Sequence, residues 1–173
     1  MRFDPSARET WERVDYNILN MGGFCLYKRT DLLEDGIAGL VAISYRIFDF
    51  DCTDWSNDAI MHSQLAARLE FPEYYGRNLD ALSECLGDFP FLQNEAAALV
   101  LRRFDDLFNR EPELAATLLH IIASAEWEFL LTERRLVCLL QSNDPWLHSK
   151  LPQSLGRRGA HWNHAEFLDA NRV

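Results

Sequence analysis

The stretch AAALVLRRFDDLFNREPELAATLLHIIASAEWEFLLTERRLVCLLQS, residues 96–142, decides the fold class. Its two ends, 96–104 and 134–142, are continuous apolar runs of the kind that form strands buried on both faces. Between them, apolar residues such as Leu114 and Leu118 recur at helical spacing and predict a long helix. Buried strands separated by helices indicate a parallel sheet, so we predict an α/β fold.

The residues before this stretch predict a further strand and two helices. Residues 40–50, LVAISYRIFDF, are β-branched and aromatic and predict a strand. A helix follows, with Ser56 or Asn57 as its N-cap, and a second, short helix runs from about Asn78 to Leu86. One α/β domain is therefore expected over residues 41–142. Its parallel strands are expected near three segments: 43–50, 97–103 and 134–141.

Residues 1–40 are expected to form an N-terminal extension made of a helix and a short strand. The helix is predicted from a capping box, Ser6 with Glu9, and it stops at the glycine pair 22–23. The run FCLYK, residues 24–28, predicts the strand, and DLLEDGIAG, residues 31–39, predicts a turn or a broken helix.

Residues 143–173 differ in composition from the rest of the chain. They contain prolines, glycines and three histidines, and their apolar residues follow no strong period. We expect an irregular C-terminal tail that packs on the domain through Trp146, Trp162 and Phe167.

The net charge of −10 is concentrated in the middle of the chain. Residues 49–95 contain ten acids and two bases, a charge of −8 in that window alone. Binding phosphates requires Lys and Arg, so we expect neither nucleic acid nor an anionic membrane surface as the direct partner. The charge asymmetry indicates either a basic partner or an acidic surface that only keeps the protein soluble.

Four cysteines, Cys25, Cys52, Cys85 and Cys138, lie far apart and form no C-x-x-C pair. Apolar neighbours such as those in GFCLY and LVCLL predict buried free thiols in a reducing compartment. The N-terminus has no apolar h-region of a secretory signal. A cytoplasmic location is therefore expected.

The segment FPEYYGRNLDALSECLGD, residues 71–88, combines a tyrosine-bearing loop with an acidic helix. Asp80 and Glu84 fall one helical turn apart, on one face. Three interpretations of this pair are open: a catalytic acid pair, an acidic surface for a basic partner, or a solvated helix face. Tyr74, Tyr75 and Asn78 favour a protein interface, because tyrosine offers a large rigid area and a hydroxyl group.

The pair His161 and His164 has the H-x-x-H spacing of some metal sites, but no third ligand accompanies it. We therefore expect no metal and no cofactor.

Residues 71–86, FPEYYGRNLDALSECL, resemble the signature of the barstar family, the intracellular inhibitors of barnase-type ribonucleases. The resemblance covers roughly residues 41–142. It implies a barstar-like three-stranded parallel sheet with helices packed on it, carrying N- and C-terminal extensions. The positions that match the family's signature in unbroken register are Pro72, Glu73, Tyr74, Tyr75, Gly76, Asn78, Leu79, Asp80, Ala81 and Leu82.

The resemblance also implies a mechanism of substrate mimicry, in which carboxylates take the place of RNA phosphates in the active site of a ribonuclease. The implied partner is a basic ribonuclease-like toxin. The implied partner-binding residues are Tyr74, Tyr75, Gly76, Asn78, Leu79, Asp80, Glu84, Gly87, Asp88 and Phe89.

Several positions depart from the family's pattern. The family's dominant acidic anchor is an aspartate, where this chain has Glu84. A tryptophan beside it is replaced by Ser83, and an acidic loop position by Arg77. A further acid on the family's later helix has no secure match: Ile122 falls near its place, and Glu126 lies one turn on. These departures favour a basic toxin other than barnase.

Three functions remain as hypotheses. The first is an immunity-type inhibitor that blocks the active site of a basic ribonuclease or related toxin. The second is a barstar-fold regulator of a non-nuclease partner. The third, an enzyme using Asp80 and Glu84, is disfavoured because no apolar wall is evident that would raise the pKa of one carboxyl.

Overall fold

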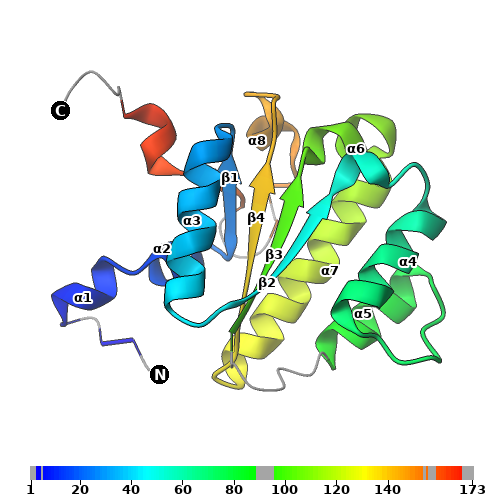
Figure 1. Cartoon of the computed structure of the whole chain (residues 1–173), viewed down its shortest axis with the longest axis horizontal. Coiled ribbons are helices and arrows are strands. Elements are labelled where there is room, and N and C mark those ends of the chain that lie inside the picture. The colour runs from blue at the N-terminus through cyan, green and yellow to red at the C-terminus, as the bar shows by residue number, and fades with distance from the viewer. Residues whose placement is uncertain (1–2, 5, 89–95, 154, 156–158, 169–173) are drawn as a thin grey trace.

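A five-stranded parallel sheet forms the centre of the computed structural model, which describes residues 3–4, 6–88, 96–153, 155 and 159–168 (Figure 1). The strand order is β2-β3-β4-β1-β5, and every pair of neighbours is parallel. The strands are β1 (Phe24–Tyr27), β2 (Arg46–Asp51), β3 (Ala96–Arg102), β4 (Arg135–Gln141) and β5 (His161–Trp162).

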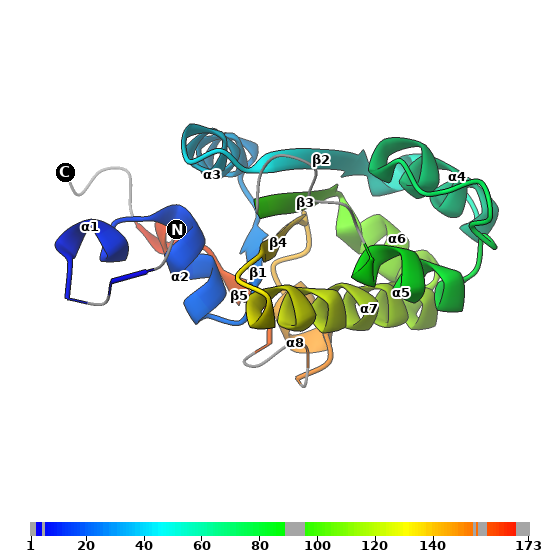
Figure 2. The ribbon, with the colours of Figure 1, turned by 90° about the horizontal axis from the view of Figure 1, so that it is seen from below.

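Helices cover both faces of this sheet. Helix α3 lies on one face, and α7, with α5 beside it, lies on the opposite face (Figure 2). The helices are α1 (Arg8–Trp11), α2 (Val14–Asn20), α3 (Thr30–Ala42), α4 (Asp58–Leu69), α5 (Leu79–Gly87), α6 (Phe104–Arg110), α7 (Pro112–Leu131) and α8 (Leu147–Lys150). Two 3₁₀ helices, η1 (Cys52–Asp54) and η2 (His164–Phe167), complete the described elements.

Alternate residues of each strand enter two separate hydrophobic cores, because successive side chains of a strand point to opposite faces. On β4, Cys138 and Leu140 belong to the core under α4, α5, α6 and α7. Val137 and Leu139 belong to the core under α2 and α3. This double burial explains why β3 and β4 are continuous apolar runs in the sequence.

The parallel α/β fold and the strands near 43–50, 97–103 and 134–141 are confirmed as β2, β3 and β4. The expected three-stranded sheet is wrong, since the sheet has five strands. The run FCLYK supplies β1, which lies between β4 and β5. All four of its residues are buried, so it is a central strand of the same sheet.

The prediction of a turn or broken helix over residues 31–39 is also wrong, because α3 is a continuous helix of 13 residues. Two glycines of α3, Gly36 and Gly39, allow neighbouring side chains to lie directly against the helix backbone. A Cβ on Gly36 would lie 2.6 Å from the hydroxyl oxygen of Tyr27, and one on Gly39 would lie 2.8 Å from Cγ2 of Val14. The glycines therefore let α3 approach β1 and α2, and they do not interrupt the helix.

The single N-terminal helix is likewise corrected to two short ones, α1 and α2. The expected capping box is absent among the described contacts, because the Ser6 hydroxyl donates to Asp4 and Ala7 is the N-cap of α1. The N-cap predicted for α4 is confirmed: the side chain of Asn57 accepts a hydrogen bond from the N–H of Ile60 at 2.9 Å.

The C-terminal tail packs on the domain through Trp162, as predicted, and through three leucines that were not predicted. Leu147, Leu151 and Leu155 enter the core, whereas Trp146 and Phe167 are 68% and 74% exposed. Trp162 is half-buried and pairs with β1 through strand β5. The leucines, Trp162 and the pairing of β5 with β1 therefore hold the tail on the domain.

The four cysteines are free and buried, as predicted, and Cys138 lies on the central strand β4. Helix α7 is long and apolar enough to cross a membrane. Its composition reflects burial under the sheet, since Leu119 and Phe129 are inaccessible to solvent.

Candidate protein-binding site

The motif loop, residues 70–78, connects α4 to α5 at the β2 side of the molecule (Figure 1). Glu70 ends α4 in the left-handed conformation, with φ of 56°, and its carboxylate pairs with Arg46. A turn then follows, in which the N–H of Tyr75 donates to the carbonyl of Pro72 at 2.9 Å. The loop is therefore held at its start by an ion pair and in its middle by a backbone turn.

The two tyrosines of the motif loop point in opposite directions. Tyr74 is 82% exposed, whereas Tyr75 is only 7% exposed. The ring of Tyr75 packs 5.0 Å from that of Phe71, and its hydroxyl oxygen lies 2.5 Å from Nδ1 of His62 on α4. Tyr74 is thus available to a partner, and Tyr75 holds the loop on the core.

Burial acts on both members of the His62–Tyr75 pair. It lowers the pKa of His62, and it raises the pKa of Tyr75 to about 12. Both groups are therefore neutral at neutral pH, and the tautomer of the imidazole decides which of them donates the hydrogen bond. Sequence reasoning missed His62, although a histidine beside Met61 on the apolar face of α4 was the available signal.

Asn78 begins the acidic helix, α5. Its side-chain oxygen accepts a hydrogen bond from the N–H of Ala81 at 2.8 Å, which is the geometry of an N-cap. Gly76 and Arg77 before it are exposed, and Arg77 has a left-handed φ of 50°. Leu79 is half-buried against the core. Within the motif, Asn78 is therefore the N-cap of α5, and Arg77 lies exposed at the surface.

The exposed face of α5 carries the two carboxylates of the motif. Leu82, Cys85 and Leu86 point into the core, which turns Asp80 and Glu84 to solvent one helical turn apart. Neither acid makes an ion pair with any residue that the structure describes. Their charges are free to meet an external cation.

The far end of α5 meets a third acid, from α7. A Cβ on Gly87 would lie 3.3 Å from the carboxylate of Glu128, so this exposed acid borders the same surface. Asp88, also exposed, follows directly in the chain. Phe89, the last of the implied binding residues, lies outside the described residues.

The later-helix acid considered from the sequence, Glu126, faces the other way. Glu126 is buried, and its side chain contacts the position where a Cβ of Gly23 would lie. Ile122 is buried in the core. The acid of α7 that borders the motif is therefore Glu128, which sequence reasoning missed because two residues on a helix differ by about 200° in direction.

Ion pairs remove part of the negative charge of residues 49–95. Asp49 pairs with Arg102, Asp51 with Arg103 and Glu70 with Arg46, and each of these arginines lies outside that window. The exposed acids of the window that make no ion pair with described residues are Asp54, Asp58, Glu73, Asp80, Glu84 and Asp88. The uncompensated charge thus lies around α4, the motif loop and α5.

Catalysis by this surface would require a carboxyl group that keeps its proton at neutral pH, and burial normally provides that. Asp80 and Glu84 are both exposed. In the part of the chain that the structure describes, no three His, Cys, Asp or Glu side chains are placed to bind a metal ion. His161 and His164 lie on β5 and η2, at the other edge of the sheet. The surface therefore combines exposed carboxylates on α5 with the exposed ring of Tyr74.

The fold and this surface together define a class of protein. The family model described as "Barstar (barnase inhibitor)" matches residues 45–141, and the chain belongs to the barstar family. Among curated proteins, a relative from Bacillus subtilis (strain 168) is named "Putative ribonuclease inhibitor YrdF". It is 37% identical over 78 residues, which are 45% of this chain and 82% of the relative.

Solved structures of the Aeropyrum pernix ORC2 protein share the fold over almost the whole chain. The ADP form has a TM-score of 0.51 at 15% identity, and the ADPNP–ADP form has 0.52 at 16%. These matches cover 92% and 93% of this chain, but only 49% and 48% of the solved chains. The chain thus spans about half the length of those proteins, and the likeness concerns the arrangement of the sheet and helices.

Proposed function

We propose that the protein is an immunity-type inhibitor that blocks the active site of a basic ribonuclease or related toxin. The observation that carries the proposal is the exposed acidic face of α5, where Asp80 and Glu84 lack ion-pair partners among the described residues. Tyr74 projects from the loop directly before it. The family membership and the curated relative support an inhibitor, and no catalytic role is proposed.

The proposed mechanism is electrostatic mimicry of RNA. The carboxylates of Asp80 and Glu84 take the places of phosphates against the Arg, Lys and His residues of the enzyme, and Tyr74 packs on the rim of its cleft. In the barnase–barstar complex itself, close charge pairs couple by about 1.5–7 kcal/mol. Repulsion between two like charges one helical turn apart costs the free helix only about 0.2–0.5 kcal/mol. Binding therefore outweighs the cost of placing both acids on one face.

The test is inhibition of RNA cleavage. A barnase-type ribonuclease from the source cell is assayed on RNA with and without one equivalent of the protein, and loss of cleavage is expected. The double variant Asp80→Ala/Glu84→Ala should restore cleavage, and Asp106→Ala, an acid on α6, is the matched control. Full cleavage in the presence of the wild-type protein would contradict the proposal.

A second candidate is a barstar-fold regulator of a non-nuclease partner. Arg77 favours it, because an exposed cation beside Asp80 suits a partner whose surface is not uniformly basic. Capture of a partner that has no nuclease activity, and whose binding is lost in Arg77→Glu, would establish this candidate in place of the first.

For both candidates we propose a cytoplasmic protein that contacts neither nucleic acid nor membrane directly. Four free, buried thiols suit a reducing compartment. Cell fractionation with an antibody against the protein tests the location.

A further inference from the structure

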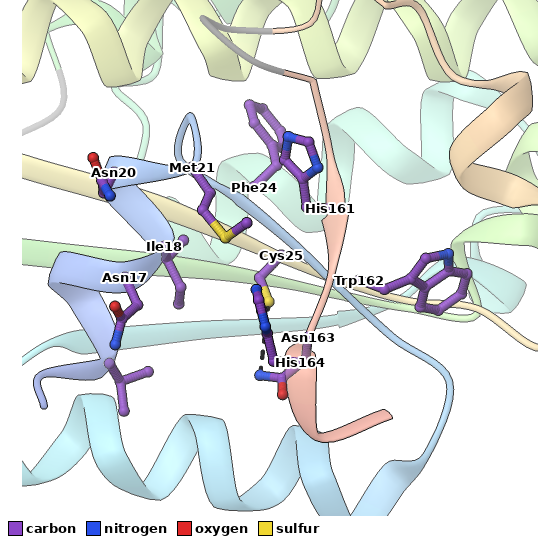
Figure 3. A pocket seen from close by; sticks show the side chains of 11 residues that line it. Asn17, Ile18, Asn20, Met21, Phe24, Cys25, His161, Trp162, Asn163 and His164 are labelled. Atoms are coloured by element: carbon purple, nitrogen blue, oxygen red, sulfur yellow. Dashed lines mark hydrogen bonds between the residues drawn. The ribbon is translucent and has the colours of Figure 1, made fainter. Parts of the chain in front are cut away.

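A cavity of about 510 Å³ lies between α2, the start of β1 and residues 161–164 (Figure 3). Its volume falls within the range of small-molecule sites in proteins. It adjoins a smaller cavity of about 260 Å³, and the two share Met21, His161, Trp162 and His164. The cavity lies at the β1–β5 side of the sheet, far from the motif loop and α5 on the β2 side (Figure 1).

Residues 161–164 form one wall of this cavity, and hydrogen bonds hold this segment on the domain. The N–H of Asn163 donates to the carbonyl of Leu26 at 2.8 Å. One carboxylate oxygen of Glu166 accepts from the N–H groups of Lys28 and Arg29, at 2.8 and 3.0 Å. We call residues 160–168 the strap. Because these bonds hold the strap in place, the cavity is formed before any ligand arrives.

The floor of the cavity is apolar and suits a flat ring. Ile18, Met21, Phe24 and Cys25 line it. Figure 3 shows the thioether of Met21 and the thiol of Cys25 turned toward the space between α2 and the strap. Thioether sulfur makes favourable contacts with aromatic rings, and aromatic surface gains most from such a floor.

The rim of the cavity is polar and contains no carboxylate. Asn17 uses its amide nitrogen to donate to the carbonyls of Trp11 and Arg13, so its side-chain oxygen has no hydrogen-bond donor among the described contacts. The side chains of Asn20 and His164 are exposed and take part in none of the described hydrogen bonds. No Asp, Glu, Lys or Arg lines the cavity. An amine would find no counter-charge there, whereas a carboxylate can accept hydrogen bonds from imidazole and amide N–H groups.

We propose that this cavity binds a small aromatic carboxylate, with its ring on the apolar floor and its carboxylate at His164. The site is independent of the acidic helix, so it adds a ligand to a protein whose proposed partner is another protein.

The test uses three indole probes that differ in charge: indole-3-acetate, neutral indole-3-acetamide and the cation tryptamine. Backbone amide shifts in NMR titrations report both affinity and location. We expect the carboxylate to bind at least about tenfold more tightly than tryptamine, the effect of one charge-assisted hydrogen bond. The shifts should fall on residues 17–25 and 161–164.

Two histidine variants separate the cavity from general charge effects. His164→Ala should weaken binding of indole-3-acetate about tenfold and leave binding of the acetamide unchanged. His120→Ala, an exposed histidine on α7, is the matched control and should change neither. Equal binding of acid and amine, an unaltered acid affinity in His164→Ala, or no shifts around the cavity at millimolar probe would each overturn the proposal.

Discussion

The phenol oxygen of Tyr75 lies 2.5 Å from Nδ1 of His62, a histidine that is only 2% exposed. This hydrogen bond joins the family's motif to a residue outside it, on the buried face of α4. The position of Tyr74, its exposed neighbour, therefore depends on an imidazole that the motif does not include.

Removing the Tyr75 hydroxyl should destabilise the protein. Tyr75→Phe leaves the ring contacts in place but deprives the buried Nδ1 of His62 of its hydrogen-bond partner, which costs about 1–3 kcal/mol of the free energy of unfolding. Tyr74→Phe is the control, and it should change stability by less than about 0.5 kcal/mol because that residue is exposed. Urea denaturation measures both. Equal stability of the two variants would show that the bond contributes nothing.

Stability should fall in mild acid because of His62. Burial lowers the pKa of this histidine in the folded state, so below about pH 6.5 the unfolded chain binds more protons than the folded one. The contribution is complete at neutral pH and decreases as the pH falls through the unfolded and then the folded pKa. His62→Gln should flatten the profile of unfolding free energy against pH between about 7 and 5, and His120→Gln should leave it as in the wild type.

The acids of α5 should govern dissociation of the partner. Asp80→Ala and Glu84→Ala should each weaken binding by about 2–5 kcal/mol, mainly through faster dissociation, because each leaves a cation of the partner unpaired. Asp54→Ala and Asp58→Ala, at exposed acids away from α5, should change chiefly the association rate and its salt dependence. Kinetics with the cognate toxin at low and physiological salt distinguish the two classes. Unchanged dissociation in both α5 variants would mean that another surface binds.

The length of the acid at position 84 should influence which enzyme is bound. Glu84→Asp restores the family's usual side chain and shortens it by one methylene group. We expect the variant to bind barnase-like enzymes more tightly than the wild type does and its own toxin less tightly. Dissociation constants for both enzymes test this, and a gain for both would indicate that Glu84 is not tuned to a particular target.

The glycines of α3 should resist a substitution that usually favours helices. Gly→Ala in an exposed helix gains about 1 kcal/mol, but a Cβ on Gly36 would lie 2.6 Å from the Tyr27 hydroxyl oxygen. Gly36→Ala should therefore lower the free energy of unfolding by about 1–3 kcal/mol. Asp35→Ala, at an exposed neighbouring position, should not destabilise. A more stable Gly36→Ala would show that β1 can shift to make room.

Features set by neighbouring residues were predicted from the sequence. Strands β3 and β4 are apolar throughout because both of their faces are covered, and α5 begins at Asn78 because its side chain caps a local N–H group. The ten-residue match to the family's signature identified the family without any structure.

Features set by distant residues were not predicted. The glycines of α3 predict a broken helix when only the local sequence is considered. Their role is to leave space for Tyr27 and Val14, which are not adjacent to them in the sequence. The place of β1 inside the sheet depends on partners more than a hundred residues away. The rotation of α7 about its own axis decides whether Glu126 or Glu128 lies next to α5. In the structure Glu126 is buried, and Glu128 lies beside Gly87 of α5.

The position of β1 also sets the order in which the chain can fold during synthesis. Cys25 leaves the ribosome early, yet its register partners, Leu139 on β4 and His161 on β5, are made more than a hundred residues later. Pairing across such separations is slow, because the loop must close before the contacts form. The apolar strand β1 therefore stays unpaired until the residues of β4 and β5 have been synthesised. The chain is most vulnerable to aggregation and proteolysis in that interval.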